Sequence, residues 1–179
     1  MQMNESELTN LLGSLRHMGS DDLNVEVKES AATLSRDVWE TVSAFANTAG
    51  GIIVLGVSER AGFVPVENFE TEKVLNQFVA GMGDAGGRGK LANPPKYTIE
   101  RVELQGTIVL VITIEELDPS SKPCYVIERG AQGGSYKRID DKDVPLSSTE
   151  VLALASYGRT TPGDRDAVPG ASADDLDET

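Results

Sequence analysis

The segment Ala44–Val57 (AFANTAGGIIVLGV) constrains this chain more than any other. An apolar helix face ends there at two adjacent glycines, and the chain continues as Gly51–Val57, a run without charged side chains. Glycine adopts the left-handed conformation that ends helices at no steric cost. An uninterrupted apolar strand is typical of the centre of a sheet, where both faces are covered. The segment therefore predicts a helix that turns tightly into a buried central strand.

The rest of the chain supplies helices and strands around that centre. A leucine stripe predicts a helix over residues 4–16, with Asn4 and Glu7 as a capping pair, and alternating apolar residues predict a strand over 23–28. The further elements expected are helices at 35–49, 67–79 and 147–158, a hairpin at 97–104 and 107–114, and a short strand at 135–139. This order predicts an α+β fold, a single domain with a mixed β-sheet flanked by helices.

The charge balance limits the partners that the whole surface can attract. The chain has 179 residues and a formal net charge of -13, from 16 Lys and Arg against 29 Asp and Glu. One domain is expected at this length, over residues 1–158, followed by a disordered acidic tail at 159–179 that is poor in bulky apolar residues. Charge of this sign repels nucleic acid and anionic membranes. Binding of nucleic acid would therefore require a local basic patch.

Neither a membrane span nor a disulfide framework is predicted. The longest apolar runs are strand-length, well below the roughly 20 residues that a spanning helix needs. The N-terminus is polar and acidic, unlike a secretory signal. The single cysteine, Cys124, fits a reducing compartment and is expected to be a small buried hydrophobe. We therefore expect a cytoplasmic protein that does not bind membranes.

A glycine-rich segment at 81–95 (GMGDAGGRGKLANPP) raises the question of phosphate binding. A P-loop requires Gly, four residues, then Gly-Lys and Ser or Thr, between a strand and a helix. Here Asp84 takes the place of the first glycine, Leu91 replaces the hydroxyl residue, and the segment follows a predicted helix. We therefore reject a P-loop, although Arg88 and Lys90 lie on this loop and could contact phosphates.

Two stretches of the chain carry a net positive charge. Residues 84–101 contain four cations against two carboxylates, and residues 120–138 contain four cations against one. If the stretches meet in space, they form a surface for a phosphate backbone; if they do not, they are ordinary surface charge. The candidate nucleic-acid contacts are Lys28, Arg88, Lys90, Arg129, Lys137 and Arg138.

Three carboxylates form a second candidate site. Glu26 lies on the polar face of its predicted strand, with Asp21 upstream, and Glu59 follows the central strand. If the two strands are neighbours, these side chains converge and could hold Mg²⁺ or Mn²⁺, which would activate water for phosphodiester cleavage. The competing interpretation is a solvated strand face on which Glu26 and Lys28 neutralise each other.

Five motifs follow one another in a characteristic order. They are VEVK at Val25–Lys28, AFANTAGG with Gly56–Val57 after it, a strand pair at Pro94–Ile114, KPCY at Lys122–Tyr125, and SYKRID at Ser135–Asp140. This order resembles the Schlafen AlbA-like domain family, which is often labelled as DNA-binding. The resemblance covers about residues 20–157, and AFANTAGG is its most specific part.

The resemblance implies two kinds of activity. Many bacterial members carry the domain at the N-terminus of transcriptional regulators, whereas nothing that we expect to fold follows residue 158 here, which predicts a stand-alone domain or a fragment. In the Schlafen branch, similar domains cleave RNA with a metal and three carboxylates. Those positions would fall on Asp21, where that branch has Glu, on Glu26, and on Glu59, where it has Asp.

The sequence leaves three functions open. The favoured one is a DNA- or RNA-binding domain of a transcriptional regulator, without a cofactor or catalysis, that contacts phosphates through a basic patch. The first alternative is a metal-dependent endoribonuclease that uses Mg²⁺ or Mn²⁺. The second is an acidic interaction module that binds a basic partner or forms a homo-oligomer through a sheet edge.

Overall fold

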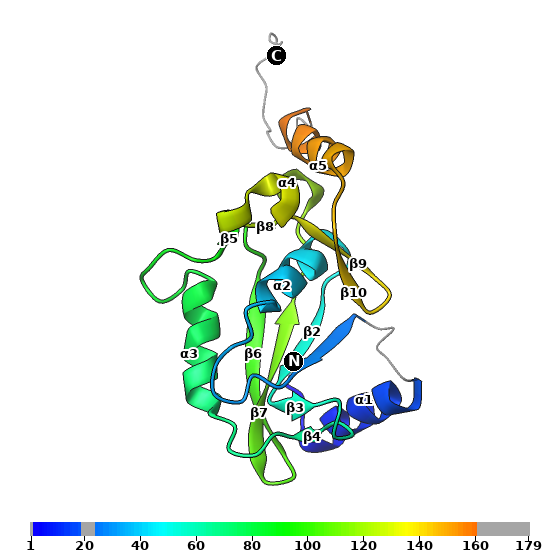
Figure 1. Cartoon of the computed structure of the whole chain (residues 1–179), viewed down its shortest axis with the longest axis vertical. Helices are drawn as coiled ribbons and strands as arrows, with labels where there is room; N and C mark the ends of the chain where they lie inside the picture. Colours follow the sequence, from blue (N-terminus) through cyan, green and yellow to red (C-terminus); the bar gives the residue numbers. More distant parts are fainter. Residues whose placement is uncertain (1, 19–23, 161–179) are drawn as a thin grey trace.

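A four-stranded sheet forms the centre of the computed structural model, which describes residues 2–18 and 24–160 (Figure 1). In spatial order its strands are β1 (Val25–Lys28), β2 (Gly51–Leu55), β7 (Thr107–Ile114) and β6 (Tyr97–Leu104). β1 runs parallel to β2, and the other two pairs are antiparallel. The predicted α+β fold with a mixed sheet is therefore confirmed.

Helices cover both faces of this sheet. α1 (Glu5–Met18) packs its leucines against one face, while α2 (Val38–Asn47) and α3 (Thr71–Gly81) pack against the other. α5 (Ser148–Thr160) lies beyond one end of the sheet (Figure 1) and continues two residues past the predicted end at Gly158. None of the helices in the described part of the chain is long and apolar enough to cross a membrane.

Short elements at the margins of the sheet were not predicted. The central strand ends at Leu55, because Gly56 turns the chain with a φ of +98° into β3 (Val57–Ser58), which pairs with β4 (Val64–Pro65). The other additions are β5 (Leu91–Ala92), η1 (Pro119–Ser121), β8 (Tyr125–Val126), η2 (Ile127–Arg129), α4 (Ala131–Gly134) and β10 (Lys142–Pro145). β5 pairs with β8, and β10 pairs with the predicted strand β9 (Tyr136–Ile139).

Two helices begin with the capping boxes that the sequence predicts. At α1, the Asn4 amide donates to Glu7 Oε1 (2.9 Å) and the Glu7 amide donates to Asn4 Oδ1 (2.8 Å). At α5, the amide of Ser147 donates to Glu150 Oε1 (2.8 Å), and the amide of Glu150 donates to Ser147 Oγ (3.1 Å). Each box satisfies two backbone donors that a helix start otherwise leaves unpaired.

Asn47, the last residue of α2, fastens this helix to two later parts of the chain. Its Nδ2 donates to the carbonyl oxygens of Cys124 and Tyr136, both at 2.9 Å, and its Oδ1 accepts from the Cys124 amide at 2.8 Å. One turn earlier, Ser43 Oγ donates to the Cys124 carbonyl (2.7 Å) and accepts from the Tyr136 amide (3.0 Å). The helix end before the two glycines therefore holds the segment 124–136 in place.

We expect Asn47→Ala to lower the free energy of unfolding by about 3 kcal/mol, because three hydrogen bonds lose a partner at roughly 1 kcal/mol each. Urea denaturation followed by circular dichroism measures this change. Asn76→Ala serves as the control, since Asn76 is exposed on α3, and its effect should stay within about 0.5 kcal/mol. Equal stability of the Asn47 variant and the unmodified chain would show that these hydrogen bonds of Asn47 do not stabilise the fold.

Candidate nucleic-acid interface

Four cations from three separate segments surround Trp39 of α2. Arg36 precedes this helix, Arg88 and Lys90 come from the glycine-rich loop, and Arg129 ends η2. With Trp39 they line two adjoining pockets, of about 380 and 100 Å³, which share Arg36, Trp39 and Lys90. All four cations are exposed. We call Arg36, Arg88, Lys90 and Arg129 the basic cluster.

Backbone pairing brings the two net-positive stretches of the sequence together at this place. Leu91 of β5 lies opposite Val126 of β8, and the amide of Ile127 donates to the Lys90 carbonyl at 3.0 Å. On its other side, the Lys90 amide donates to the carbonyl of Gly81 at 2.6 Å. Lys90 is therefore held between the end of α3 and η2, which carries Arg129.

Two glycines allow the loop and the tryptophan to pack closely. A Cβ at Gly81 would lie 2.1 Å from Cζ2 of Trp39, and a Cβ at Gly89 would lie 2.8 Å from the Gly81 carbonyl oxygen. The indole also stacks on Phe78, with ring centroids 5.3 Å apart and an interplanar angle of 23°. Trp39 is consequently fixed in place, with 8% of its surface exposed.

The basic cluster keeps most of its positive charge. Arg129 pairs with Glu40 at 2.9 Å, and this hydrogen bond raises the pKa of the guanidinium, which stays charged. Glu128 is the carboxylate among the residues that line these pockets. Among the residues that the structure describes, the other three cations of the cluster form no salt bridge. An anion that enters the pockets therefore meets cations whose charge is only partly compensated.

Lys28 and Arg138 lie inside the protein instead of at this surface. Their side chains are 10% and 1% exposed. Lys28 Nζ lies 3.1 Å from Asp37 and 3.5 Å from Glu26, and Arg138 Nη1 lies 2.9 Å from Glu26 and 2.8 Å from Asp143. Both cations are therefore compensated by carboxylates of this chain and lie outside the basic cluster.

Lys137 also lies apart from the basic cluster. Its Nζ donates to Glu150 Oε2 at 2.7 Å, which links β9 to the first turn of α5. Together with the Ser147 amide, this contact lowers the pKa of Glu150 to about 2. Of the six predicted contacts, the structure thus brings together Arg88, Lys90 and Arg129.

Of the three carboxylates considered as metal ligands, the structure describes Glu26 and Glu59, and Asp21 lies outside the described residues. β1 and β2 are neighbours, as the hypothesis requires. However, the Glu26 carboxylate contacts Arg138 and Lys28, and burial raises its pKa against the influence of these cations. Glu59 is exposed. Within the described ranges, no group of three His, Cys, Asp or Glu side chains could hold a metal ion.

We expect Arg138→Met to destabilise the protein by about 3 kcal/mol at neutral pH, because Glu26 and Asp143 lose the cation between them. This loss of stability should shrink as the pH falls towards the ordinary carboxyl range, because Glu26 then takes up a proton. The folded state binds this proton more tightly than the unfolded chain does, so acidification stabilises it. Urea denaturation at several pH values measures both effects.

Lys142→Met is the control for this prediction, because Lys142 is 78% exposed on the β9–β10 hairpin. Its effect should stay within about 0.5 kcal/mol. An Arg138 variant with the stability of the control would show that the buried ion pairs contribute nothing.

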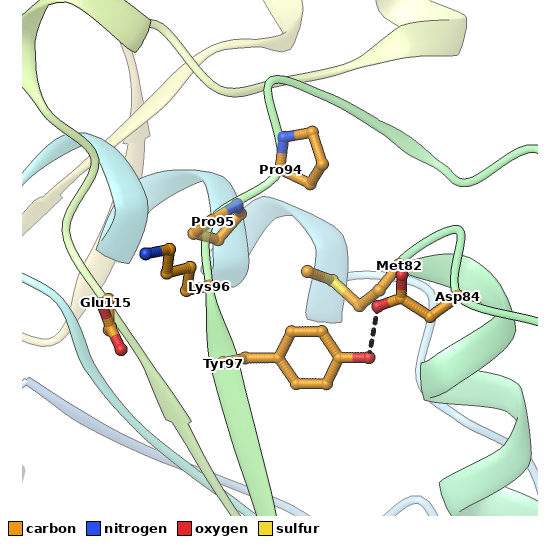
Figure 2. Close-up of a pocket in the computed structure, with 7 residues that line it drawn as sticks. All are labelled: Met82, Asp84, Pro94, Pro95, Lys96, Tyr97 and Glu115. Atoms are coloured by element: carbon orange, nitrogen blue, oxygen red, sulfur yellow. Dashed lines mark hydrogen bonds between the residues drawn. The ribbon is translucent and has the colours of Figure 1, made fainter.

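A third pocket, of about 440 Å³, lies at the start of β6 (Figure 2). Its charged lining residues are Lys96, Asp84 and Glu115, so one cation faces two carboxylates. The Tyr97 hydroxyl donates to Asp84 Oδ2 at 2.7 Å, as Figure 2 shows. Burial and this hydrogen bond raise the pKa of Tyr97 to about 12. With more carboxylates than cations, this pocket does not favour a phosphate, whereas the basic cluster does.

We expect Asp84→Asn to lower the pKa of Tyr97 from about 12 towards its ordinary value of about 10, because the phenolate would no longer form beside a carboxylate. Phenolate absorbance in an alkaline titration measures this pKa, and Tyr97→Phe identifies its contribution. The folded state binds the Tyr97 proton more tightly than the unfolded chain does. We therefore expect the contribution of Tyr97 to the free energy of unfolding to decline as the pH rises from about 10 to about 12. An unchanged titration in the Asn variant would contradict the contact.

Arg36 and Trp39 belong to this site but were not predicted from the sequence. Arg36 is followed by Asp37 and Glu40, so its surroundings carry no net positive charge. Trp39 lies within the helix predicted at 35–49, and most of its surface is buried. A tryptophan close to an arginine in the sequence is the signal that was available.

Comparisons with known proteins support the assignment of the fold. The family model described as "Schlafen, AlbA_2" matches residues 21–147. The N-terminal domain of a RecG-related protein from Nitrosomonas europaea, named after an ATP-dependent DNA helicase, is 28% identical, with a TM-score of 0.56 over 75% of this chain and 90% of that one.

A second solved structure has weaker similarity. The DIP2311 protein from Corynebacterium diphtheriae is 16% identical, with a TM-score of 0.48 over 83% of this chain and 28% of that one. The search of curated proteins returned no match.

Proposed function

Since this chain belongs to the Schlafen AlbA_2 family, we propose that it is a nucleic-acid-binding domain that holds phosphates with the basic cluster. The observation that carries this proposal is the convergence of Arg36, Arg88, Lys90 and Arg129 around one exposed site in a chain with a net charge of -13. Clustered cations are the usual electrostatic footprint of phosphate binding. The remaining acidic surface restricts the contact to this site.

The structural neighbour is consistent with this proposal. A domain 28% identical to this one forms the N-terminus of a protein named after a DNA helicase, so DNA is the ligand that we would test first. A place in a transcriptional regulator and a cytoplasmic location remain parts of the same proposal. The phosphate contacts fix the position on the strand and carry no sequence information by themselves.

A metal-dependent ribonuclease is not favoured by any contact in the described residues. Glu26, which would be central to such a site, is paired with Arg138 and Lys28. A metal ion at Glu26 would have to compete with these two cations for the same oxygens.

We expect the double variant Arg88→Gln, Lys90→Gln to weaken DNA binding roughly tenfold at low salt, because two side chains that hold phosphates become neutral. In the unmodified chain the logarithm of the binding constant should fall linearly with the logarithm of the salt concentration. In the variant this slope should be smaller by about 0.7 to 0.9 for each phosphate that the protein no longer neutralises. Fluorescence anisotropy of a labelled oligonucleotide at several salt concentrations measures both quantities.

The matched control is Lys73→Gln, Lys142→Gln, which removes the same number of charges from exposed positions outside the basic cluster. Its affinity and salt slope should stay close to those of the unmodified chain. Equally weakened binding in both double variants would mean that net charge alone governs binding. Binding that does not depend on salt, or no binding, would overturn the proposed function.

A further inference from the structure

The larger of the two pockets at Trp39 combines an apolar lining with a basic rim. Leu34, Trp39 and Ala80 supply apolar surface, and Arg36, Arg88 and Lys90 supply the cations. The volume of about 380 Å³ lies within the range of pockets that bind small organic molecules. Phosphates need only the cations, so the apolar part of the pocket is not explained by phosphate binding.

Two side chains that line this pocket each carry a hydrogen-bond donor without a partner among the described residues. The first is Nε1 of Trp39, although an indole buried to this degree usually donates to a protein group. The second is Nε2 of Gln77, whose amide is oriented because its Oε1 accepts from the Leu34 amide at 2.7 Å. The pocket therefore offers apolar contact together with donors for a ligand that carries acceptor atoms.

A nucleobase has this combination of properties. It is a flat, weakly polar ring with carbonyl or ring-nitrogen acceptors on its edge, and it is attached to a backbone of phosphates. Phe78 stacks on the indole, and only 8% of the Trp39 surface is exposed. The base would therefore contact the small part of the indole that stays accessible, together with Leu34 and Ala80. The cations at the rim lie where flanking phosphates would be held.

We infer that this pocket binds one unpaired base of a single-stranded nucleic acid, an inference that rests on the proposed function and specifies its ligand. A base within a duplex is stacked, and its pairing edge is occupied. To enter the pocket it must leave the stack, which costs free energy that a single strand does not lose. The domain should therefore prefer single strands to duplexes of the same sequence and length.

Trp39 reports directly on this binding, because it is the single tryptophan of the chain. We would titrate the full chain with single-stranded oligothymidylate and with an oligomer of the same length whose sugars carry no bases. Both present the same phosphates to the basic cluster. Oligothymidylate should change the Trp39 emission until saturation. The abasic oligomer should leave the emission unchanged and bind at least about fivefold more weakly, which is the lower end of what a base–aromatic contact contributes.

Ala80→Phe fills the pocket without removing a cation or a core residue, because Ala80 is exposed on α3. This variant should bind oligothymidylate no more tightly than the abasic oligomer. Asn76→Phe places the same side chain at an exposed position of α3 that does not line the pocket, so its affinities should match those of the unmodified chain. Circular dichroism of both variants checks that they fold.

The possible outcomes separate this inference from the proposed function. If the abasic oligomer or the duplex binds as tightly as oligothymidylate and all show the expected salt dependence, the base pocket is wrong and the phosphate surface stands. Unchanged affinity of a folded Ala80→Phe variant would also overturn the pocket. If no oligomer binds in a salt-dependent manner, both proposals are wrong.

Discussion

The side-chain amide of Asn47 positions the parts of the chain that make the candidate interface. α2 carries Trp39, and the segment fastened by Asn47 through Cys124 and Tyr136 carries Arg129. The same segment contains β8, whose pairing with β5 places Lys90 beside it. An amide can donate and accept at the same time, so one side chain satisfies backbone groups of both kinds. This motif residue therefore supports the interface without lying in the pockets.

The number of cations in a stretch of sequence does not by itself locate a phosphate surface. In this acidic protein several cations serve the fold. Lys28 and Arg138, whose own side chains are largely buried, compensate neighbouring carboxylates. Lys122, with 10% of its side chain exposed, donates to Glu116 at 2.6 Å. Arg36, Arg88 and Lys90 are exposed without a salt bridge in the described structure, as Lys73 and Lys96 also are. What distinguishes the three is that they line one pocket together. Pairing, which depends on tertiary contacts, decides which cations can attract an external anion.

The sequence predicted those features that depend on local pattern. The β6–β7 hairpin matches its predicted bounds residue for residue, and both capping boxes form. Two-residue strands such as β5 are too short for a periodic signal and depend on their partners. The positions of the cations also depend on tertiary contacts. Half of the predicted phosphate contacts therefore lie outside the basic cluster, and Arg36 belongs to it because the glycine-rich loop approaches α2. Residues that a fold brings together from distant segments leave no common pattern in the sequence.

The glycines of the 81–95 segment show how packing can imitate a phosphate-binding motif. Gly81 leaves room for the indole of Trp39, and Gly89 lets the loop fold back onto the end of α3. Both positions exclude a Cβ because of protein atoms, so these two glycines need no bound phosphate to explain them. Arg88 and Lys90, on either side of Gly89, are exposed as a consequence. The side chains between the glycines, and not a backbone cradle as in a P-loop, are therefore the groups that a ligand would meet.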